Sequence, residues 1–318
     1  MRTQTSETRT MRIGTLFLTD NWPDKNIRKF LNYIQHLEAE GFDNVWMANL
    51  QDLDALTALA LAGPATSRIG LGSAVTPIQV RHPVAMAQQA LTTAIACDNR
   101  FTLGIGLSHK VVIEDMLGLN YQHPAAHMQE YLDILMPLLR GEAVRHQGPL
   151  YRVDGRLKLG TGRPVPCIVG ALGPRMLKIA GTLADGTVTW MTGPKTLNSH
   201  IIPTITRAAA VAGRPSPRVV AGLPVSLCQD VPAARARLNA SLKLYGVLPS
   251  YRAMLDREGV AGPGDIALLG DEESLQRQLV ALRDMGVTDL NAAVLEVEPG
   301  SQRRTIAFLA KLRAWMDA

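Results

Sequence analysis

The chain has 318 residues, of which 47% are hydrophobic and 19% are charged, and its net charge is +5. No apolar run reaches the roughly 18 residues of a membrane span and no signal peptide opens the chain, so we expect a cytoplasmic protein without membrane contact. The basic residues are scattered rather than clustered, which excludes a nucleic-acid partner.

The first half of the chain alternates short apolar segments with segments of helical spacing. In chain order we predict strand 13–18, helix 27–40, strand 44–48, helix 53–65, strand 68–75, helix 82–97, strand 100–105 and helix 124–140. Because His82 precedes Pro83 at a predicted helix start, we expect it to cap or pack rather than to catalyse.

The second half continues the alternation. We predict strand 166–169, helix 174–183, strand 186–190, helix 197–212, strand 218–228, helix 231–258, helix 273–285, strand 288–295 and helix 305–316. Eight strands, most of them separated by helices, favour a closed (β/α)8 TIM barrel over an open sheet.

Two connections are longer than a plain barrel needs. Residues 141–165 lie between the fourth and fifth strands, and residues 229–272 follow the seventh strand. We interpret both as insertions, and long loops after barrel strands commonly build the active site. The polar residues 1–10 are predicted to be a disordered extension, and 11–318 a single catalytic domain.

Metal-ligating and disulfide patterns are absent from the sequence. The three cysteines, Cys97, Cys167 and Cys228, have no CxxC spacing, so we expect reduced, buried thiols. His123 and His127 are four residues apart but belong to no HExxH motif. We therefore predict no metal site.

Two glycine-rich segments end predicted strands. Leu103–His109 lacks the third glycine of the dinucleotide fingerprint, and no acidic residue completes that motif, which argues against a Rossmann unit. Residues 68–77 likewise end a predicted strand in small residues, namely Gly72, Ser73 and Ala74. Both segments fit either a barrel rim that lets a flat ligand approach the backbone or simple turn geometry.

A third glycine-rich turn runs directly into a helix. Its sequence, VGALGPRMLKIAG, covers residues 169–181, with Pro174 at the first helical position. Such a turn exposes backbone N–H groups to an anion. We expect the N–H groups of Gly173, Arg175 and Met176, and the charge of Arg175, to bind a phosphate, whereas Pro174 donates nothing.

Aromatic residues follow the sixth predicted strand and recur in the second insertion. Trp190 and Met191 either stack on an aromatic ligand or pack in the core. Tyr245, Tyr251 and Arg252 either line a pocket or lie on a helix surface.

Several segments resemble the bacterial luciferase-like superfamily, in order and spacing, from Met11 to about Ala310. They are EGFDNVW (40–46), RIGLGS (68–73), RHP (81–83), RFTLGIG (100–106) and LADG (183–186). Three others are similar to its actinobacterial coenzyme F420-dependent oxidoreductases: GLSH (106–109), ALGPRM (171–176) and WMTGP (190–194).

The resemblance implies a luciferase-like barrel, a homodimer and a deazaflavin across its C-terminal rim. It implies a non-prolyl cis peptide after the third strand, matched here by Ser73–Ala74. The resemblance also implies a set of cofactor contacts, some of which match the family in their place along the chain and not in a motif. They are Asn49, Ser73, Ala74, Thr76, Gly106, Leu107, Ser108, Gly170, Ala171, Leu172, Gly173, Pro174, Arg175 and Met176. FMN is the alternative cofactor, because FMN enzymes share the barrel and FMN also carries a phosphate.

One departure from the family pattern bears on the reaction. The family's sugar-phosphate dehydrogenases have a catalytic His after the second strand and a Glu after the fourth, where this chain has Ala48–Asp52 and Ser108–Lys110. This favours reduction of an activated C=C or C=N bond of a small molecule, with His109, or alternatively solvent, as the proton donor.

The residues expected to face that substrate are Trp190, Thr192, Lys195, Tyr245, Tyr251 and Arg252. Two alternatives to the reductase stay open at this point. One is an FMN-dependent monooxygenase of the same fold, and the other is a non-catalytic flavin-binding protein.

Overall fold

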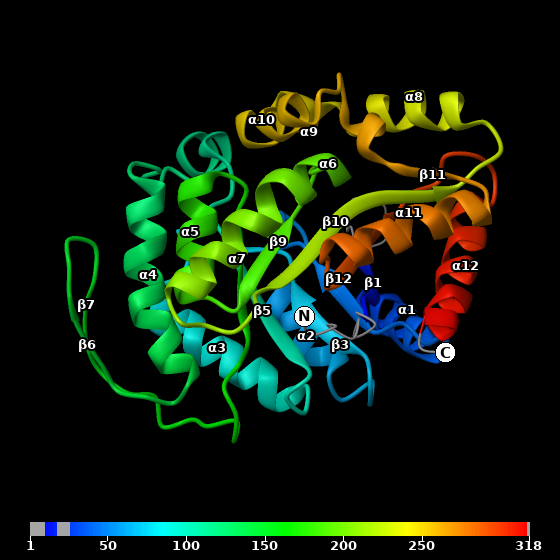
Figure 1. Cartoon of the computed structure of the whole chain (residues 1–318). Helices are drawn as coiled ribbons and strands as arrows, with labels where there is room; N and C mark the ends of the chain where they lie inside the picture. Colours follow the sequence, from blue (N-terminus) through cyan, green and yellow to red (C-terminus); the bar gives the residue numbers. More distant parts are fainter. Residues whose placement is uncertain (1–9, 18–25, 317–318) are drawn as a thin grey trace, which may run out of the picture.

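The computed structural model describes residues 10–17 and 26–316, so residues 1–9 of the predicted extension lie outside the described residues. Eight parallel strands close into a barrel that helices surround (Figure 1). In order around the barrel they are β1 (Arg12–Phe17), β2 (Asn44–Met47), β3 (Gly70–Ser73), β5 (Phe101–Gly106), β8 (Cys167–Gly170), β9 (Gly186–Thr189), β10 (Arg218–Leu227) and β12 (Asp289–Val294). The predicted (β/α)8 barrel is confirmed.

The helices cover the outside of the barrel because each buries one apolar face. The outer helices are α1 (Ile27–Ala39), α2 (Ala55–Ala62), α3 (Pro83–Ala96), α4 (Pro124–Leu139), α5 (Pro174–Leu183), α7 (Ile202–Val211), α11 (Glu272–Met285) and α12 (Ser301–Met316). In α1, for example, Phe30, Ile34 and Leu37 are fully buried. None of the helices in the described part is long and apolar enough to span a membrane.

Two local predictions from the sequence are confirmed. His82 caps α3, because its Nδ1 accepts a hydrogen bond from the Val84 N–H at 3.3 Å. Cys97, Cys167 and Cys228 are all buried, free thiols.

The insertion after the seventh strand differs from the single helix predicted over 231–258. It forms three helices, α8 (Val231–Ser241), α9 (Lys243–Val247) and α10 (Pro249–Glu258), before the short strand β11 (Leu268–Gly270) joins the edge of β10. Pro249 has no N–H and starts a new helix instead of continuing α9. The three helices lie over the C-terminal end of the barrel, at the top of Figure 1.

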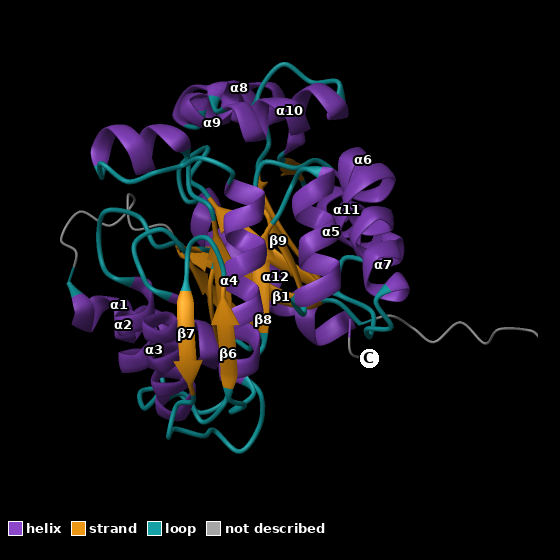
Figure 2. Ribbon diagram, turned by 90° about the vertical axis from the view of Figure 1, so that its left-hand side faces the viewer, coloured by secondary structure: helices purple, strands orange, loops and turns teal. Residues whose placement is uncertain are grey.

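The segment 141–165 contains a hairpin that the sequence analysis did not predict. Its strands β6 (Val144–Gln147) and β7 (Arg152–Gly155) pair antiparallel and run along the outside of α4 (Figure 2). Glu130 of α4 holds the hairpin, since its carboxylate accepts hydrogen bonds from the N–H groups of Leu150 and Tyr151 and pairs with His146 at 3.1 Å.

The barrel interior is filled in layers. Trp46 forms a small apolar cluster with Ile168, Val188 and Val220, and Gly72 leaves the space that the Trp46 ring occupies. Ala74 and Val75 pack on this cluster from the C-terminal side. The interior is therefore closed beneath the end of the barrel where the loops after the strands meet.

Candidate functional site

The centre of the C-terminal rim is formed by the segment that follows β3. The peptide bond between Ala74 and Val75 is cis. The prediction of a cis bond at Ser73–Ala74 is therefore wrong by one residue. Ser73 remains part of β3 because its hydroxyl donates to the Gly104 carbonyl at 2.9 Å and accepts from the Gly104 N–H at 2.8 Å, so the turn starts after it.

Val75 rests on two glycines of neighbouring strands. A Cβ atom on Gly106 of β5 would lie 2.4 Å from Val75 Cγ2, and one on Gly170 of β8 would lie 3.4 Å from Val75 Cγ1. The missing side chains therefore let Val75 lie low between β3, β5 and β8. Ala74 and Val75, both half-buried, form a surface that we call the shelf, and a flat ligand can lie on it.

The turn after β8 presents unpaired backbone donors. The Leu177 N–H bonds to the Gly173 carbonyl at 2.9 Å, and no side chain caps the start of α5. The N–H groups of Arg175 and Met176 precede this first helical bond, so they point away from the helix, toward any ligand at its N-terminus. A Cβ atom on Gly173 would meet nothing within 4 Å, so the approach is open.

Two buried residues that the sequence analysis missed fix this turn from behind. Thr187 of β9 donates its hydroxyl to the carbonyls of Val169 and Ala171, at 2.8 and 3.2 Å. His200 Nε2 lies 2.8 Å from the Leu172 carbonyl, which can only accept, so this nitrogen carries the proton. Both residues belong to elements far from the turn in sequence, and no local motif marks them.

The loop after β5 is held by two other hydrogen bonds. The Gln79 amide donates to the Leu107 carbonyl at 2.9 Å, and the Tyr121 hydroxyl donates to the Ser108 carbonyl at 3.3 Å. These bonds support the half-buried His109 at the rim. Burial lowers the pKa of His109 below its ordinary value of 6.5, so its imidazole is mostly neutral at pH 7.

His109 belongs to a chain of aromatic contacts that joins the rim to the insertion. Its ring lies 5.3 Å from that of Tyr251, Tyr251 lies 5.6 Å from Tyr245, and Tyr245 lies 5.8 Å from Trp190, all centroid to centroid and edge to face. We call these four residues the aromatic wall. The structure thus brings together four residues that were predicted to act on the substrate.

Three other predicted substrate residues do not join the wall. Lys195 Nζ donates to the Glu258 carbonyl at 3.3 Å, and Arg252 donates to Asp256, Val260 and Ala261 within the insertion. Thr192 is fully buried, and its hydroxyl donates to the nearby Trp190 carbonyl at 3.2 Å.

Some predicted cofactor contacts have a structural role as well. Asn49 Oδ1 accepts from the N–H of Ala55, the first residue of α2, at 2.9 Å, while Asp54 is the N-cap of that helix. The Ser73 hydroxyl is fully committed to Gly104, as described above. Thr76 is buried beside the shelf on the two-residue strand β4 (Thr76–Pro77), and its hydroxyl has no hydrogen-bond partner among the described residues.

The site is suited to a phosphorylated, flat organic ligand. The open N-terminus of α5 is suited to a phosphate, and the shelf between β3, β5 and β8 is suited to a ring system. No group of three or more His, Cys, Asp or Glu residues that could hold a metal occurs within the described residues. His127 instead pairs with the Tyr151 hydroxyl at 2.7 Å.

Proteins whose names describe oxidoreductases or reductases match much of the chain. "Putative coenzyme F420-dependent oxidoreductase Rv3520c" of Mycobacterium tuberculosis is 31% identical over 225 residues, 65% of each chain and so just under two thirds. The 5,10-methylenetetrahydromethanopterin reductase of Methanolobus tindarius is 27% identical over 240 residues, covering 75% of this chain and 73% of that protein.

Solved structures share the fold. The coenzyme F420-dependent tetrahydromethanopterin reductase of Methanopyrus kandleri superposes with a TM-score of 0.78 at 22% identity, covering 95% of this chain and 97% of the other. The sequence model of the luciferase-like monooxygenase family matches residues 11–289, most of the chain. Because this match spans most of the chain, the protein belongs to the luciferase-like monooxygenase family.

Proposed function

We propose that this protein is a coenzyme F420-dependent reductase that saturates an activated C=C or C=N bond of a small molecule. The observation that carries the proposal is the open N-terminus of α5 beside the shelf, because it accommodates a phosphate and a flat ring together. The choice of F420 over FMN is supported by the names of the relatives and by the resemblance of the rim motifs.

When bound, reduced F420 would supply a hydride, which carries two electrons, to one atom of the double bond and would be left oxidised. The other atom of that bond then needs one proton. His109 can deliver it from the rim, where its ring contacts Tyr251 of the insertion. Thr187 and His200 keep the turn's donors aimed at the phosphate.

The direct test is turnover with reduced F420. The protein is mixed with reduced F420 and a panel of enones and imines, and the return of the absorbance of oxidised F420 is followed. The proposal expects reoxidation that depends on both protein and substrate. It fails if no member of the panel speeds the reaction while F420 is shown to be bound.

Replacing His109 with alanine is expected to lower kcat by about 100-fold or more, the usual effect of losing a general acid, with little change in cofactor affinity. Because burial holds the His109 pKa below 6.5, the wild-type kcat should rise as pH falls through a value below 6.5. The variant should lose that limb of the pH profile. An unchanged kcat in the variant removes His109 from the mechanism.

Replacing His200 with phenylalanine is expected to weaken cofactor binding about 3- to 10-fold, because the Leu172 carbonyl loses its partner and the turn relaxes. Titration of the cofactor measures this effect. Ser199→Ala is the matched control, since the Ser199 hydroxyl bonds only the Lys195 carbonyl among the described contacts. Equal affinity in both variants would show that His200 does not orient the turn.

We also propose that the protein is a homodimer. The proposal is supported by exposed apolar side chains on and beside the adjacent helices α2 and α3, namely Leu61, Val80 and Ile95, which are 43–48% exposed. Light scattering on the intact chain should give twice the monomer mass, and a monomer at all concentrations would contradict the proposal.

A further inference from the structure

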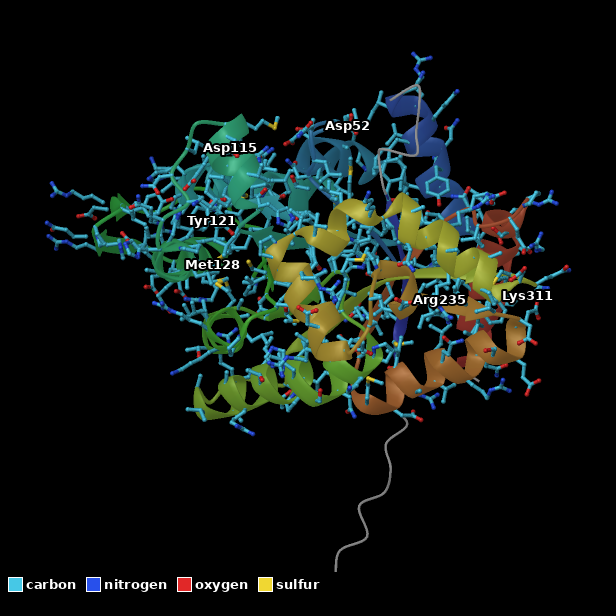
Figure 3. All side chains as sticks on the ribbon, turned by 90° about the horizontal axis from the view of Figure 1, so that it is seen from above. Asp52, Asp115, Tyr121, Met128, Arg235 and Lys311 are labelled. Carbon is cyan, nitrogen blue, oxygen red and sulfur yellow. The ribbon has the colours of Figure 1, made fainter. Side chains whose placement is uncertain are left out.

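The insertion after β10 places its aromatic residues at the rim. Seen from above, the yellow insertion that carries Arg235 crosses the top of the barrel, and the segments that carry Asp52 and Asp115 lie beside it (Figure 3). Tyr245 of α9 and Tyr251 of α10 contact Trp190 after β9 and His109 after β5. The wall therefore extends from the end of β5 to the end of β9. Strand β8, whose following turn presents the N–H groups for an anion, lies between these two strands.

The shelf lies beside the wall. Val75 contacts the positions of Gly106 and Gly170, which end β5 and β8. His109 is three residues beyond Gly106, so the loop that supports the shelf also carries one end of the wall. A ligand between the shelf and the insertion would therefore meet ring edges and faces.

Two cations near the wall, Arg252 and Lys195, were expected from the sequence to face the substrate, and both are held by hydrogen bonds within the protein. Each of the three side-chain nitrogens of Arg252 donates a hydrogen bond at 2.8 Å, to Asp256 Oδ1 and to the carbonyls of Ala261 and Val260. Lys195 is bound to the last residue of α10. Both cations are therefore held by groups of the protein, in and beside α10.

The acidic group at this end of the insertion is committed as well. Glu258 accepts from the N–H groups of Lys195 and Thr196 at 3.0 and 2.7 Å, which caps the short helix α6 (Pro194–Thr196). Gly193 lies against it, since a Cβ atom there would be 2.4 Å from Glu258 Cδ. Glu258 thus fastens α10 to the barrel instead of facing a ligand.

Two titratable groups of the wall, Tyr251 and His109, are mostly neutral near pH 7. Burial raises the pKa of the Tyr251 hydroxyl and lowers that of His109, so neither carries a full charge there. A charged ligand would lose hydration against these rings, whereas a planar uncharged ligand would gain stacking contacts.

We propose that the substrate is an uncharged molecule with a planar unsaturated or aromatic face, which packs against the wall of His109, Trp190, Tyr245 and Tyr251. The proposal rests on the proposed reductase function, because it names the substrate class of that same site. It is tested by binding, which requires no turnover.

The test compares three ligands of one shape, benzalacetone and its ring-carboxylate and ring-trimethylammonium derivatives. Equilibrium dialysis measures Kd for the protein alone and with oxidised F420, which cannot transfer a hydride. Benzalacetone should bind at least about tenfold more tightly than either charged derivative. Equal or tighter binding of a charged derivative, or no detectable binding of benzalacetone in either state, would overturn the proposal.

Variants of the insertion show whether the wall makes the contact. Tyr251→Leu should weaken benzalacetone binding about five- to tenfold, whereas Tyr251→Phe, which keeps the ring, should stay within about twofold of the wild type. Leu244→Ala is the control, because Leu244 is an exposed neighbour of Tyr245 on α9. If Tyr251→Leu binds like the control, the wall does not bind the substrate.

The two proposals fail in different ways. If F420 neither binds nor is reoxidised but benzalacetone still binds more tightly than its charged derivatives, the proposed function is wrong and the substrate class stands. If reduced F420 is reoxidised only by the charged derivatives, the function stands and the substrate class is wrong.

Discussion

Replacing Gly106 with alanine is expected to weaken cofactor binding by about 5- to 150-fold, the equivalent of about 1–3 kcal/mol of overpacking. The new Cβ atom would lie 2.4 Å from Val75 Cγ2, so Val75 must move. Val75 packs on the Trp46 cluster inside the barrel and lies against Gly170 of β8. It can therefore move only away from the barrel interior, toward the C-terminal rim. The shelf would then rise into the space of the bound ring.

Cofactor titration measures this effect, with thermal unfolding as the check that the barrel persists. Gly160→Ala is the matched control, because a Cβ atom on Gly160 meets nothing within 4 Å and the residue is exposed. A Gly106→Ala variant that stays folded and binds cofactor like the control would show that the ring does not lie on Val75.

Replacing Asp289 with asparagine is expected to cost about 3–5 kcal/mol of the free energy of unfolding, as loss of one partner of a buried ion pair does. Asp289 is fully buried at the start of β12. Its carboxylate accepts hydrogen bonds from Arg218 at 2.6 and 2.9 Å and from Arg12 at 2.9 Å, which joins β10, β12 and β1. The variant leaves both guanidinium groups without their counter-charge.

Urea denaturation measures the loss, and Asp284→Asn is the control. The Asp284 side chain is 60% exposed in its pair with Arg283, and exposed pairs contribute less than about 1 kcal/mol. Similar losses in the two variants would contradict a central role of Asp289 in closing the barrel.

The pH dependence gives a second check on Asp289. Burial alone would raise its pKa, but the hydrogen bonds and charge of Arg218, with Arg12 and Thr288, outweigh burial and hold the pKa below the ordinary 3.8. This contribution to stability is therefore fully present above pH 3.8 and is lost as pH falls through the lower, folded-state value. The asparagine variant should lack that part of the acid-induced loss.

The barrel could be predicted from the sequence because its signals are local. Alternating apolar and amphipathic segments gave all eight barrel strands, and the Gly-Pro pattern at Gly173 and Pro174 identified the start of α5. The capping role of His82 was equally local, since it depends on the proline that follows.

The residues that the sequence did not reveal act through tertiary contacts. Thr187 and His200 hold the turn after β8 from other elements, and Glu258 captures Lys195 from the far end of the insertion. Lys195 was predicted to face the substrate because the sequence shows that it follows a strand. The sequence does not show which group its side chain bonds. The cis bond was misplaced for the same reason, since Gly104 on another strand fixes Ser73.

The hairpin β6–β7 was missed because its strands are short and mostly polar. Each four-residue strand contains only one apolar residue, Val144 or Val153, which is too few to reveal a strand pattern in the sequence. It is held by the buried Glu130 of α4, a residue whose role only the folded chain shows.

The proposed reductase function requires that the site binds a deazaflavin and uses it to reduce a substrate. An equilibrium titration of the purified chain with coenzyme F420 and, separately, with FMN tests it most directly. We predict that F420 binds at least about tenfold more tightly than FMN and that Arg175→Glu weakens this binding. Binding of FMN without binding of F420, with oxygen uptake when reduced FMN is supplied, would contradict this function and identify a monooxygenase.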